Sequence, residues 1–271
     1  MPEDTAAQAP VRVWDCGGAR PVLALHCSLA HSGAWGGLAG HLSGVTVTGL
    51  DQPGHGRAPD WDGQTEMHGL ASRAATELAQ TMGGGAPIDL IGHSFGATVA
   101  LRIALERPDL VRSLVLVEPV IFAAARVAGD LTYGRFRAQH LAFAAVLAEG
   151  LRAEAAAMFH AAWGTGEGLD ALPERQRQYI IDRIHLIVAQ NPVLLDDAAG
   201  LLTHQRLEAL GVPVLLVEGA CSPPIIDAVQ YELARRLPQV TRLVVQGAGH
   251  MVPITHPAKM ARAVMAHWAG C

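Results

Sequence analysis

Residues 87–106, PIDLIGHSFGATVALRIALE, decide the fold of this chain. The run IDLI is typical of a short strand, and ATVALRIALE has the composition and spacing of a helix. Between them lies Gly92-His93-Ser94-Phe95-Gly96, a G-x-S-x-G sequence. In this context the serine lies on a sharp strand-to-helix turn, with its hydroxyl exposed over the helix N-terminus, where developing negative charge is stabilised. The stretch therefore predicts that Ser94 is a nucleophile.

The same alternation of strand and helix patterns continues along most of the chain, which is typical of a mostly parallel sheet with helices on both faces. Apolar and β-branched runs predict strands at 11–14, 22–26, 45–49, 87–91, 112–117, 213–217 and 241–245. Helical patterns cover 66–82, 95–106, 224–236 and 257–269. We therefore expect an α/β fold whose core consists of residues 1–120 and 211–271.

The segment 121–210 breaks this alternation because it contains no convincing strand. Its Ala-rich and Leu-rich pattern predicts helices at 133–149, 151–163, 173–190 and 192–202, separated by Gly and Pro positions. A helical insertion between two strands predicts a cap, or lid, over the carboxyl ends of the sheet.

A histidine near the end of the chain is the candidate base for Ser94. A serine hydroxyl is a poor nucleophile without a base. His250 follows the predicted strand 241–245 in a glycine-flanked loop, Gly247-Ala248-Gly249-His250. The carboxyl ends of parallel strands meet at one edge of the sheet, so this loop and Ser94 face the same edge. We expect His250 to be the base.

An oxyanion hole needs two N–H groups that point at the reacting carbonyl oxygen. One donor is expected from Phe95, the residue after the nucleophile. The second is expected from the loop after strand 22–26, and Ser28 is the candidate in that loop.

Four sequence blocks resemble those of the α/β-hydrolases, in particular capped members of the esterase and haloperoxidase-like kind. Residues 26–35 resemble the H-G-x7-W loop, with Cys27 where the family has Gly, and residues 51–57 resemble the D-x-P-G-H-G turn. Residues 92–96 and 247–253 resemble the nucleophile turn and the histidine loop. The resemblance implies an α/β-hydrolase fold, and it implies that Asp51 and His55 form a structural turn under the site.

The acid of the triad departs from this resemblance. Family members commonly carry Asp three residues after the Gly that ends the strand before the histidine strand, and here that position holds Ser222. Some branches carry the acid after the preceding strand, which in this chain ends at Glu118. We expect Glu118 to orient His250 and balance its charge, with Asp227 and Glu218 as the alternatives.

The expected function is that of a cofactor-free serine hydrolase, which cleaves a carboxylic ester or related acyl bond through an acyl-enzyme. Cleavage of a C–C bond, a lactone or a thioester with the same triad remains open. So does a non-catalytic sensor of a small molecule. His93 is expected to line the pocket or orient the turn. Cap arginines 126, 135 and 137 are expected on a solvated face rather than on an anionic substrate.

Composition excludes several other classes of protein. The chain has 20 Lys and Arg against 25 Asp and Glu, a net charge of −5, which predicts no nucleic-acid partner. No apolar stretch is long enough to predict a membrane span, and the first ten residues do not resemble a secretory signal. The scattered cysteines 16, 27, 221 and 271 predict neither a metal site nor disulfides. We expect a cytoplasmic protein with a small-molecule substrate, and the sequence leaves its oligomeric state open.

Overall fold

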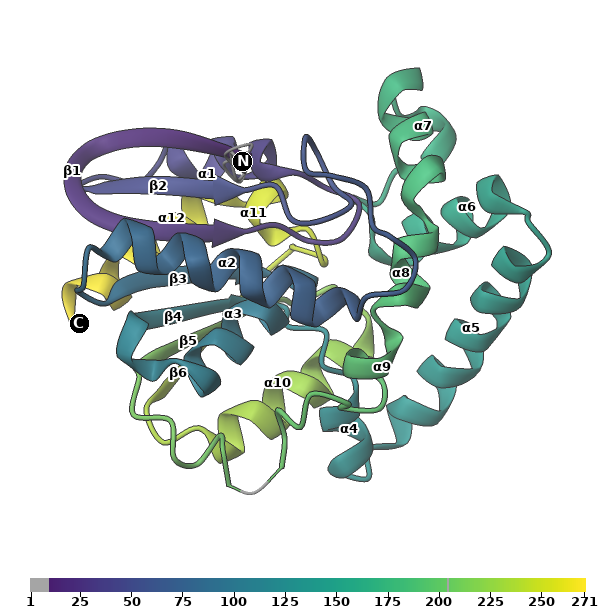
Figure 1. The fold of residues 1–271 in the computed structure, drawn as a ribbon. Helices are drawn as coiled ribbons and strands as arrows, with labels where there is room; N and C mark the ends of the chain where they lie inside the picture. The colour runs from purple at the N-terminus through teal and green to yellow at the C-terminus, as the bar shows by residue number, and fades with distance from the viewer. Residues whose placement is uncertain (1–9, 204) are drawn as a thin grey trace, which may run out of the picture.

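A computed structural model describes residues 10–203 and 205–271, so residues 1–9 of the predicted core and residue 204 of the predicted cap lie outside it. The α/β fold is confirmed, with a six-stranded sheet in the order β2-β1-β3-β4-β5-β6 (Figure 1). The strands are β1 (Val11–Leu25), β2 (Val45–Leu50), β3 (Ile88–His93), β4 (Val111–Val117), β5 (Val214–Gly219) and β6 (Val240–Val245).

Strand β1 folds back around β2, which differs from the two separate strands predicted at 11–14 and 22–26. Its first half runs against β2, with Val11 opposite Leu50 and Cys16 opposite Val45. Its second half runs with β2, from Arg20 opposite Val45 onward. The chain stays extended through the Gly17-Gly18 bend, so the two predicted strands form one continuous element that encloses β2 on both sides (Figure 1).

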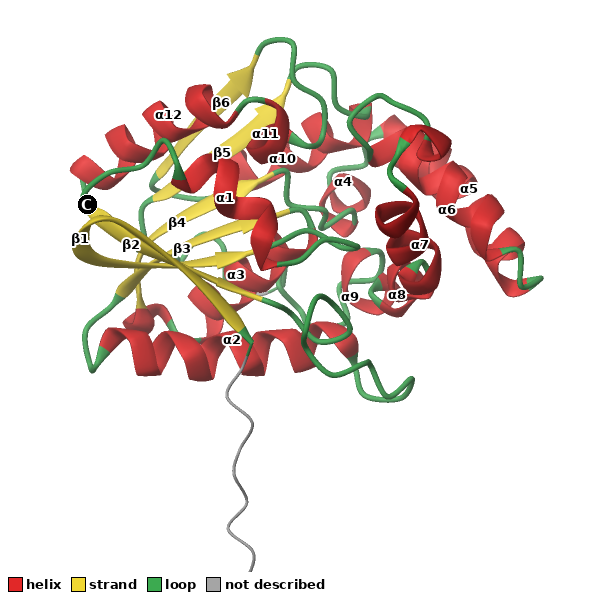
Figure 2. Cartoon of the chain, turned by 90° about the horizontal axis from the view of Figure 1, so that it is seen from above, coloured by secondary structure: helices red, strands yellow, loops and turns green. Residues whose placement is uncertain are grey.

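Helices cover both faces of the sheet (Figure 2). One apolar cluster joins α2, α3 and α10 to one face, and a second joins α1, α11 and α12 to the other. The helices are α1 (Gly36–Ala39), α2 (Met67–Gly83), α3 (Phe95–Glu106), α4 (Ala123–Val127), α5 (Leu131–Ala148), α6 (Arg152–Trp163), α7 (Glu174–Arg183), α8 (His185–Ala189), α9 (Asn191–Leu194), α10 (Pro224–Arg236), α11 (Val252–Thr255) and α12 (Pro257–Ala269).

A helical insertion is present between β4 and β5, as predicted, but two of its helices differ from the prediction. The predicted helix 173–190 is divided into α7 and α8. The predicted helix 192–202 ends after one turn, because Asp197 adopts a positive φ of 55° and its carboxylate accepts the N–H groups of Leu201 and Leu202. The carboxylate thereby replaces helical hydrogen bonds with a turn.

The middle of this insertion has an apolar cluster of its own, which includes Phe143, Ile180 and Ile184. Its two ends pack instead into the main core: residues 121–125 are buried there, and so is Leu201. Helices α5 to α8 lie beyond the carboxyl ends of the strands, at the right of Figure 1. No helix in the described ranges is long and apolar enough to cross a membrane.

Candidate active site

Ser94 lies on a sharp turn between β3 and α3. Its backbone has φ 56° and ψ −118°, a conformation that is strained for a residue with a side chain. The turn requires both flanking glycines, because a Cβ atom on Gly92 would lie 2.3 Å from the Gly96 carbonyl oxygen, and one on Gly96 would lie 2.2 Å from that of Leu25. The N–H of Ser94 donates to the Val117 carbonyl at 2.8 Å, which fixes the turn to the end of β4.

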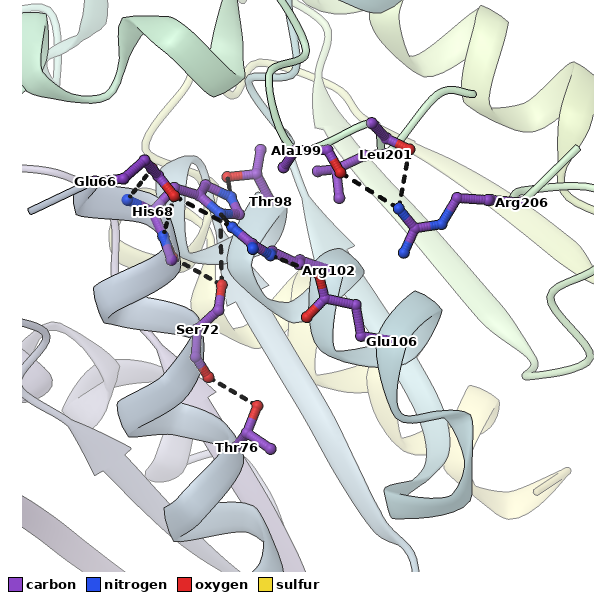
Figure 3. A network of polar contacts seen from close by, with 12 residues as sticks. Glu66, His68, Ser72, Thr76, Thr98, Arg102, Glu106, Ala199, Leu201 and Arg206 are labelled. Carbon is purple, nitrogen blue, oxygen red and sulfur yellow. Dashed lines mark hydrogen bonds and ion pairs between the residues drawn. The ribbon is translucent and has the colours of Figure 1, made fainter. Parts of the chain in front are cut away.

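A polar network between α2 and α3 holds the first turn of α3 (Figure 3). The Thr98 hydroxyl donates to the Phe95 carbonyl at 2.6 Å, so its oxygen accepts from Nε2 of His68 at 3.1 Å. The His68 ring also stands edge to face against the Phe95 ring. Burial, reinforced by the nearby Arg102, lowers the pKa of His68 to about 3. This histidine is therefore neutral, and through Thr98 it holds Phe95, the residue that follows Ser94.

Glu118 and His250 form a buried pair. Nδ1 of His250 lies 2.5 Å from Oε2 of Glu118. The other carboxylate oxygen, Oε1, accepts the Gly219 N–H at 2.7 Å and the Ser222 hydroxyl. Burial favours the protonated acid, but the charge of His250 and these hydrogen bonds outweigh it and lower the pKa of Glu118. The carboxylate is thus held ionised against the imidazole.

The alternative acids lie elsewhere. Glu218 pairs with Arg242 at 2.7 Å, and Asp227 pairs with the same guanidinium. Both carboxylates are therefore neutralised at the β6 side of the sheet and neither contacts His250. Ser222, at the position where the resemblance implies an acid, contacts Glu118 instead. Of the three acidic candidates, the structure brings only Glu118 to the histidine.

His93 holds the loop of His250 from inside the sheet. Its Nε2 atom donates to the His250 carbonyl at 2.9 Å, and the two rings lie 5.1 Å apart. Burial, reinforced by His250, lowers the pKa of His93 to about 3, so its ring is neutral. His93 therefore orients the histidine loop through the backbone.

The loop expected to carry the second oxyanion donor lies beside Ser94 in a common cavity. Its sharp bend places Leu29 at a positive φ of 59°. Within the described residues, the N–H groups of Ser28 and Phe95 have no hydrogen-bond acceptor. The Ser28 hydroxyl donates to Oε1 of Gln190 in the insertion at 2.7 Å. Burial raises the pKa of Cys27 to about 12, so this thiol is almost entirely protonated at neutral pH.

The turn at residues 51–57 is held by its own hydrogen bonds. The Asp51 carboxylate accepts the Ser32 N–H at 2.6 Å and the Arg57 N–H at 3.1 Å. Nδ1 of His55 donates to the Pro53 carbonyl at 2.9 Å, and burial lowers the pKa of His55 to about 3. Asp51 therefore ties the loop that follows β1 to this turn, and its carboxylate makes no contact with His250.

A cavity of about 860 Å³ is lined by Ser94, His250 and Ser28, whereas Glu118 and Phe95 lie behind its wall. Ser94, His250, Cys27 and Ser28 line it from the sheet side, and α6 and α7 close it from the insertion side. Arginines 126, 135 and 137 are exposed and do not line it. No cluster suited to a metal ion occurs within the described ranges.

Sequence reasoning missed the insertion residues that complete this cavity. The Trp163 ring contacts His250 edge to face at 4.8 Å. The Tyr179 hydroxyl donates to the Ala30 carbonyl at 2.9 Å and accepts the Gly56 N–H at 2.8 Å, which ties α7 to two core loops. The spacing of Arg175, Tyr179 and Arg183 at four-residue intervals is a one-face helix pattern that could have indicated this side of α7.

Comparison with known proteins gives several relatives. A hundred-residue segment is 38% identical to lipase LipV of Mycobacterium tuberculosis and spans 37% of each chain, so it covers only a minor part of that lipase. The pimeloyl-acyl-carrier-protein methyl ester esterase of Neisseria meningitidis serogroup B is 30% identical, over 78% of this chain and 77% of its own. The (E)-2-((N-methylformamido)methylene)succinate hydrolase of Acinetobacter baylyi is 26% identical, over 81% and 79% respectively.

Solved structures agree on the fold. A serine hydrolase involved in carbazole degradation has a TM-score of 0.70 and 17% identity, and it covers 96% of this chain and 95% of its own. A lipase-like protein from Acinetobacter baumannii has a TM-score of 0.72 and 16% identity, with 97% and 92% coverage. The sequence profile described as "alpha/beta hydrolase fold" matches residues 20–257. The match spans most of the chain, which therefore belongs to the alpha/beta hydrolase fold family.

Proposed function

We propose that this protein is a serine hydrolase that cleaves a carboxylic ester through an acyl-enzyme, with Ser94, His250 and Glu118 as its triad. The observation that carries the proposal is the buried contact between Nδ1 of His250 and the Glu118 carboxylate, beside a cavity that His250 shares with Ser94. The esterase and lipase among the relatives support ester cleavage rather than another acyl reaction.

The proposed reaction follows from the hydrogen bonds of the pair. Because ionised Glu118 accepts the proton of Nδ1, the neutral form of the His250 ring presents Nε2 as the acceptor for the Ser94 hydroxyl proton. Ser94 then attacks the ester carbonyl, and the N–H groups of Ser28 and Phe95 stabilise the oxyanion. Nε2–H donates its proton to the departing alcohol, which leaves the acyl group on Ser94. Water, deprotonated by the same nitrogen, then attacks the acyl carbon, and Nε2–H returns its proton to the Ser94 oxygen as the carboxylic acid leaves.

The test is the hydrolysis of p-nitrophenyl esters from acetate to dodecanoate. We expect turnover that Ser94→Ala abolishes and a chain-length optimum that reflects the cavity. Ser43→Ala, at a serine outside the cavity, is the matched control and keeps wild-type turnover. A fluorophosphonate should label the wild-type protein and not Ser94→Ala.

Two results would contradict the proposal. Ester turnover that survives in Ser94→Ala would exclude Ser94 as the nucleophile. Labelling of Ser94 without turnover of any ester would favour a small-molecule sensor with this fold, or a hydrolase for another bond.

A further inference from the structure

The cavity at Ser94 carries the opposite charge to the rest of the molecule. Four arginines line it, and the only carboxylate that lines it from the described residues is Asp51. The whole chain has a net charge of −5. Asp51 is buried, and its oxygens already accept the backbone N–H groups of Ser32 and Arg57. The cavity therefore has a positive excess, which favours anionic ligands.

Helix α7 separates its charges between two sides. Arg175, Tyr179 and Arg183 follow at four-residue intervals and all line the cavity. Arg177 lies off the cavity and pairs with Glu174. The carboxylate of Asp182 likewise lies off the cavity.

Asp182 accepts a hydrogen bond from the Gln178 amide, within the same helix. The acidic groups of α7 are thus occupied on its outer side, and its cavity side presents two guanidinium groups and a phenol. No carboxylate within the described ranges forms an ion pair with Arg175 or Arg183.

Arg183 is held rigidly in this position. Its guanidinium carbon lies 4.0 Å above the centre of the Tyr179 ring, a cation–π contact. Its Nε donates to the Gly54 carbonyl at 3.2 Å. Tyr179 is fixed in turn by Ala30 and Gly56. Arg183 is half-buried and lines the cavity, and its two terminal nitrogens make no hydrogen bond to the described protein, so both are free to donate to a ligand there.

We infer that the substrate carries an anionic group, a carboxylate or a phosphate, which Arg175 and Arg183 bind while the ester carbonyl lies at Ser94. A carboxylate or phosphate accepts paired hydrogen bonds from a guanidinium, and partial burial of Arg183 strengthens them relative to bulk water. This inference rests on the proposed ester hydrolysis and adds a substrate class to it.

The experiment compares esters of the same length that differ in charge: p-nitrophenyl pentanoate and mono-p-nitrophenyl glutarate. A p-nitrophenyl ester that ends in a phosphonate is the third arm. We expect the wild-type protein to have a kcat/KM at least about tenfold higher for an anionic ester than for pentanoate, equivalent to one charge-assisted hydrogen bond. The preference should fall as NaCl rises from 50 to 500 mM. If kcat/KM is higher for the glutarate ester than for the phosphonate ester, the anionic group of the substrate is a carboxylate. If it is higher for the phosphonate ester, the group is a phosphate.

Substitutions of the two arginines test where the anionic group of the substrate binds. Arg175→Gln combined with Arg183→Gln should lower the anionic-to-neutral ratio of kcat/KM at least about tenfold, mainly by raising KM for the anionic ester. Arg183→Lys keeps the charge but not the fork and should lose part of the preference. Arg177→Gln is the matched control, because it removes an arginine from the same helix outside the cavity, and it should leave the ratio unchanged. Thermal melting of each variant reports whether it folds.

Failure of this inference is distinguishable from failure of the proposed function. Ser94-dependent hydrolysis of pentanoate with no preference for either anionic ester overturns the inference alone, as does a ratio that survives in the double variant. If no ester is turned over, the proposed function fails. Calorimetric titration with glutarate and with inorganic phosphate then decides the anion site: binding lost in the double variant supports it, and no binding of either anion to the wild-type protein overturns it.

Discussion

The indole of Trp163 stands edge to face against the imidazole of His250, with the ring centroids 4.8 Å apart. Trp163 is the last residue of α6, so the helical insertion contacts the proposed base directly. The same indole packs against Phe122 and Phe159, which places it through the apolar packing of the insertion. The insertion therefore helps to position His250 and also shapes the cavity.

Replacement of Trp163 tests this contact. Trp163→Ala should lower kcat for a neutral ester by about tenfold, because His250 loses a packing partner and water reaches the pair with Glu118. Trp163→Phe keeps an aromatic edge and should retain most of the activity. The measurement is kcat and melting temperature for both variants. An alanine variant with wild-type kcat would show that the ring does not position His250.

Glu118→Gln tests the proposed acid. Glutamine has nearly the same volume but no charge, so we expect kcat to fall by about a thousandfold or more while the circular dichroism spectrum is kept. Ser222→Ala removes one of the hydrogen bonds that lower the pKa of Glu118, and its effect should be far smaller. Asp227→Asn and Glu218→Gln are the controls. Near-wild-type turnover in Glu118→Gln, or a comparable loss in a control, would contradict the assignment.

Gly92→Ala tests the steric basis of the nucleophile turn. The added methyl group would lie 2.3 Å from the Gly96 carbonyl oxygen, so the free energy of unfolding should fall by about 3 kcal/mol or more, or the chain should fail to fold. Gly134→Ala in α5 is the opposite control. Its methyl group meets no atom within 4 Å, and alanine favours a helix, so stability should rise by about 0.5–1 kcal/mol. Urea denaturation measures both. Equal stabilities of the two variants would contradict the steric account.

Four buried histidines predict loss of stability in mild acid. Burial lowers the pKa of His26 to about 4 and those of His55, His68 and His93 to about 3. Below pH of about 6.5 the unfolded chain binds protons at these residues, whereas the folded protein does not until its own lower pKa values are reached. Unfolding is thereby favoured between about pH 6.5 and 4, by up to about 1.4 kcal/mol per pH unit for each histidine.

The pH effect can be measured by urea unfolding at pH 7.5, 6.0 and 5.0. His68→Gln keeps a donor toward Thr98 but cannot titrate, so its free energy of unfolding should depend on pH less steeply, by up to about 1.4 kcal/mol per unit between pH 6.0 and 5.0. Identical slopes for the variant and the wild type would show that His68 does not contribute.

The burial of Cys27 predicts that its thiol is unreactive. With a pKa of about 12, almost no thiolate is present at pH 8, so iodoacetamide should label exposed Cys221 and spare Cys27. In urea both should react, which is the control for the reagent. Mass spectrometry of the peptides reads out the result, and labelling of Cys27 in the folded protein at the rate of Cys221 would refute it.

Local sequence was sufficient for much of the core and for the residues of the candidate pair. Strand runs and turn residues predict where β3, β4 and β6 end, and therefore which edge of the sheet carries Ser94, Glu118 and His250. Only local patterns are needed for this, because parallel strands bring their carboxyl ends together. Glu118 could be preferred to Asp227 from its place at the end of a strand. The partner of Asp227, Arg242, could not be predicted, since it lies on strand β6 whereas Asp227 lies in helix α10.

The insertion was harder to predict because tertiary contacts decide its structure. Helical spacing continues through Ile184, where the chain nevertheless divides into α7 and α8. The turn at Asp197 depends on a side chain that competes with the backbone for hydrogen bonds. Trp163 and Arg183 lie in different helices, so no local pattern indicates that they line the same cavity as Ser94.

The hydrogen bond from Ser222 to Glu118 has an evolutionary consequence. It brings together Glu118, which directly follows β4, and the position after β5 where the family resemblance implies an acid. A lineage could acquire an aspartate at residue 222 while Glu118 is still present, and lose the glutamate later. Single substitutions thus connect the two arrangements without a step in which the histidine has no acid, and this adjacency offers a route by which the acid could migrate between strands during descent.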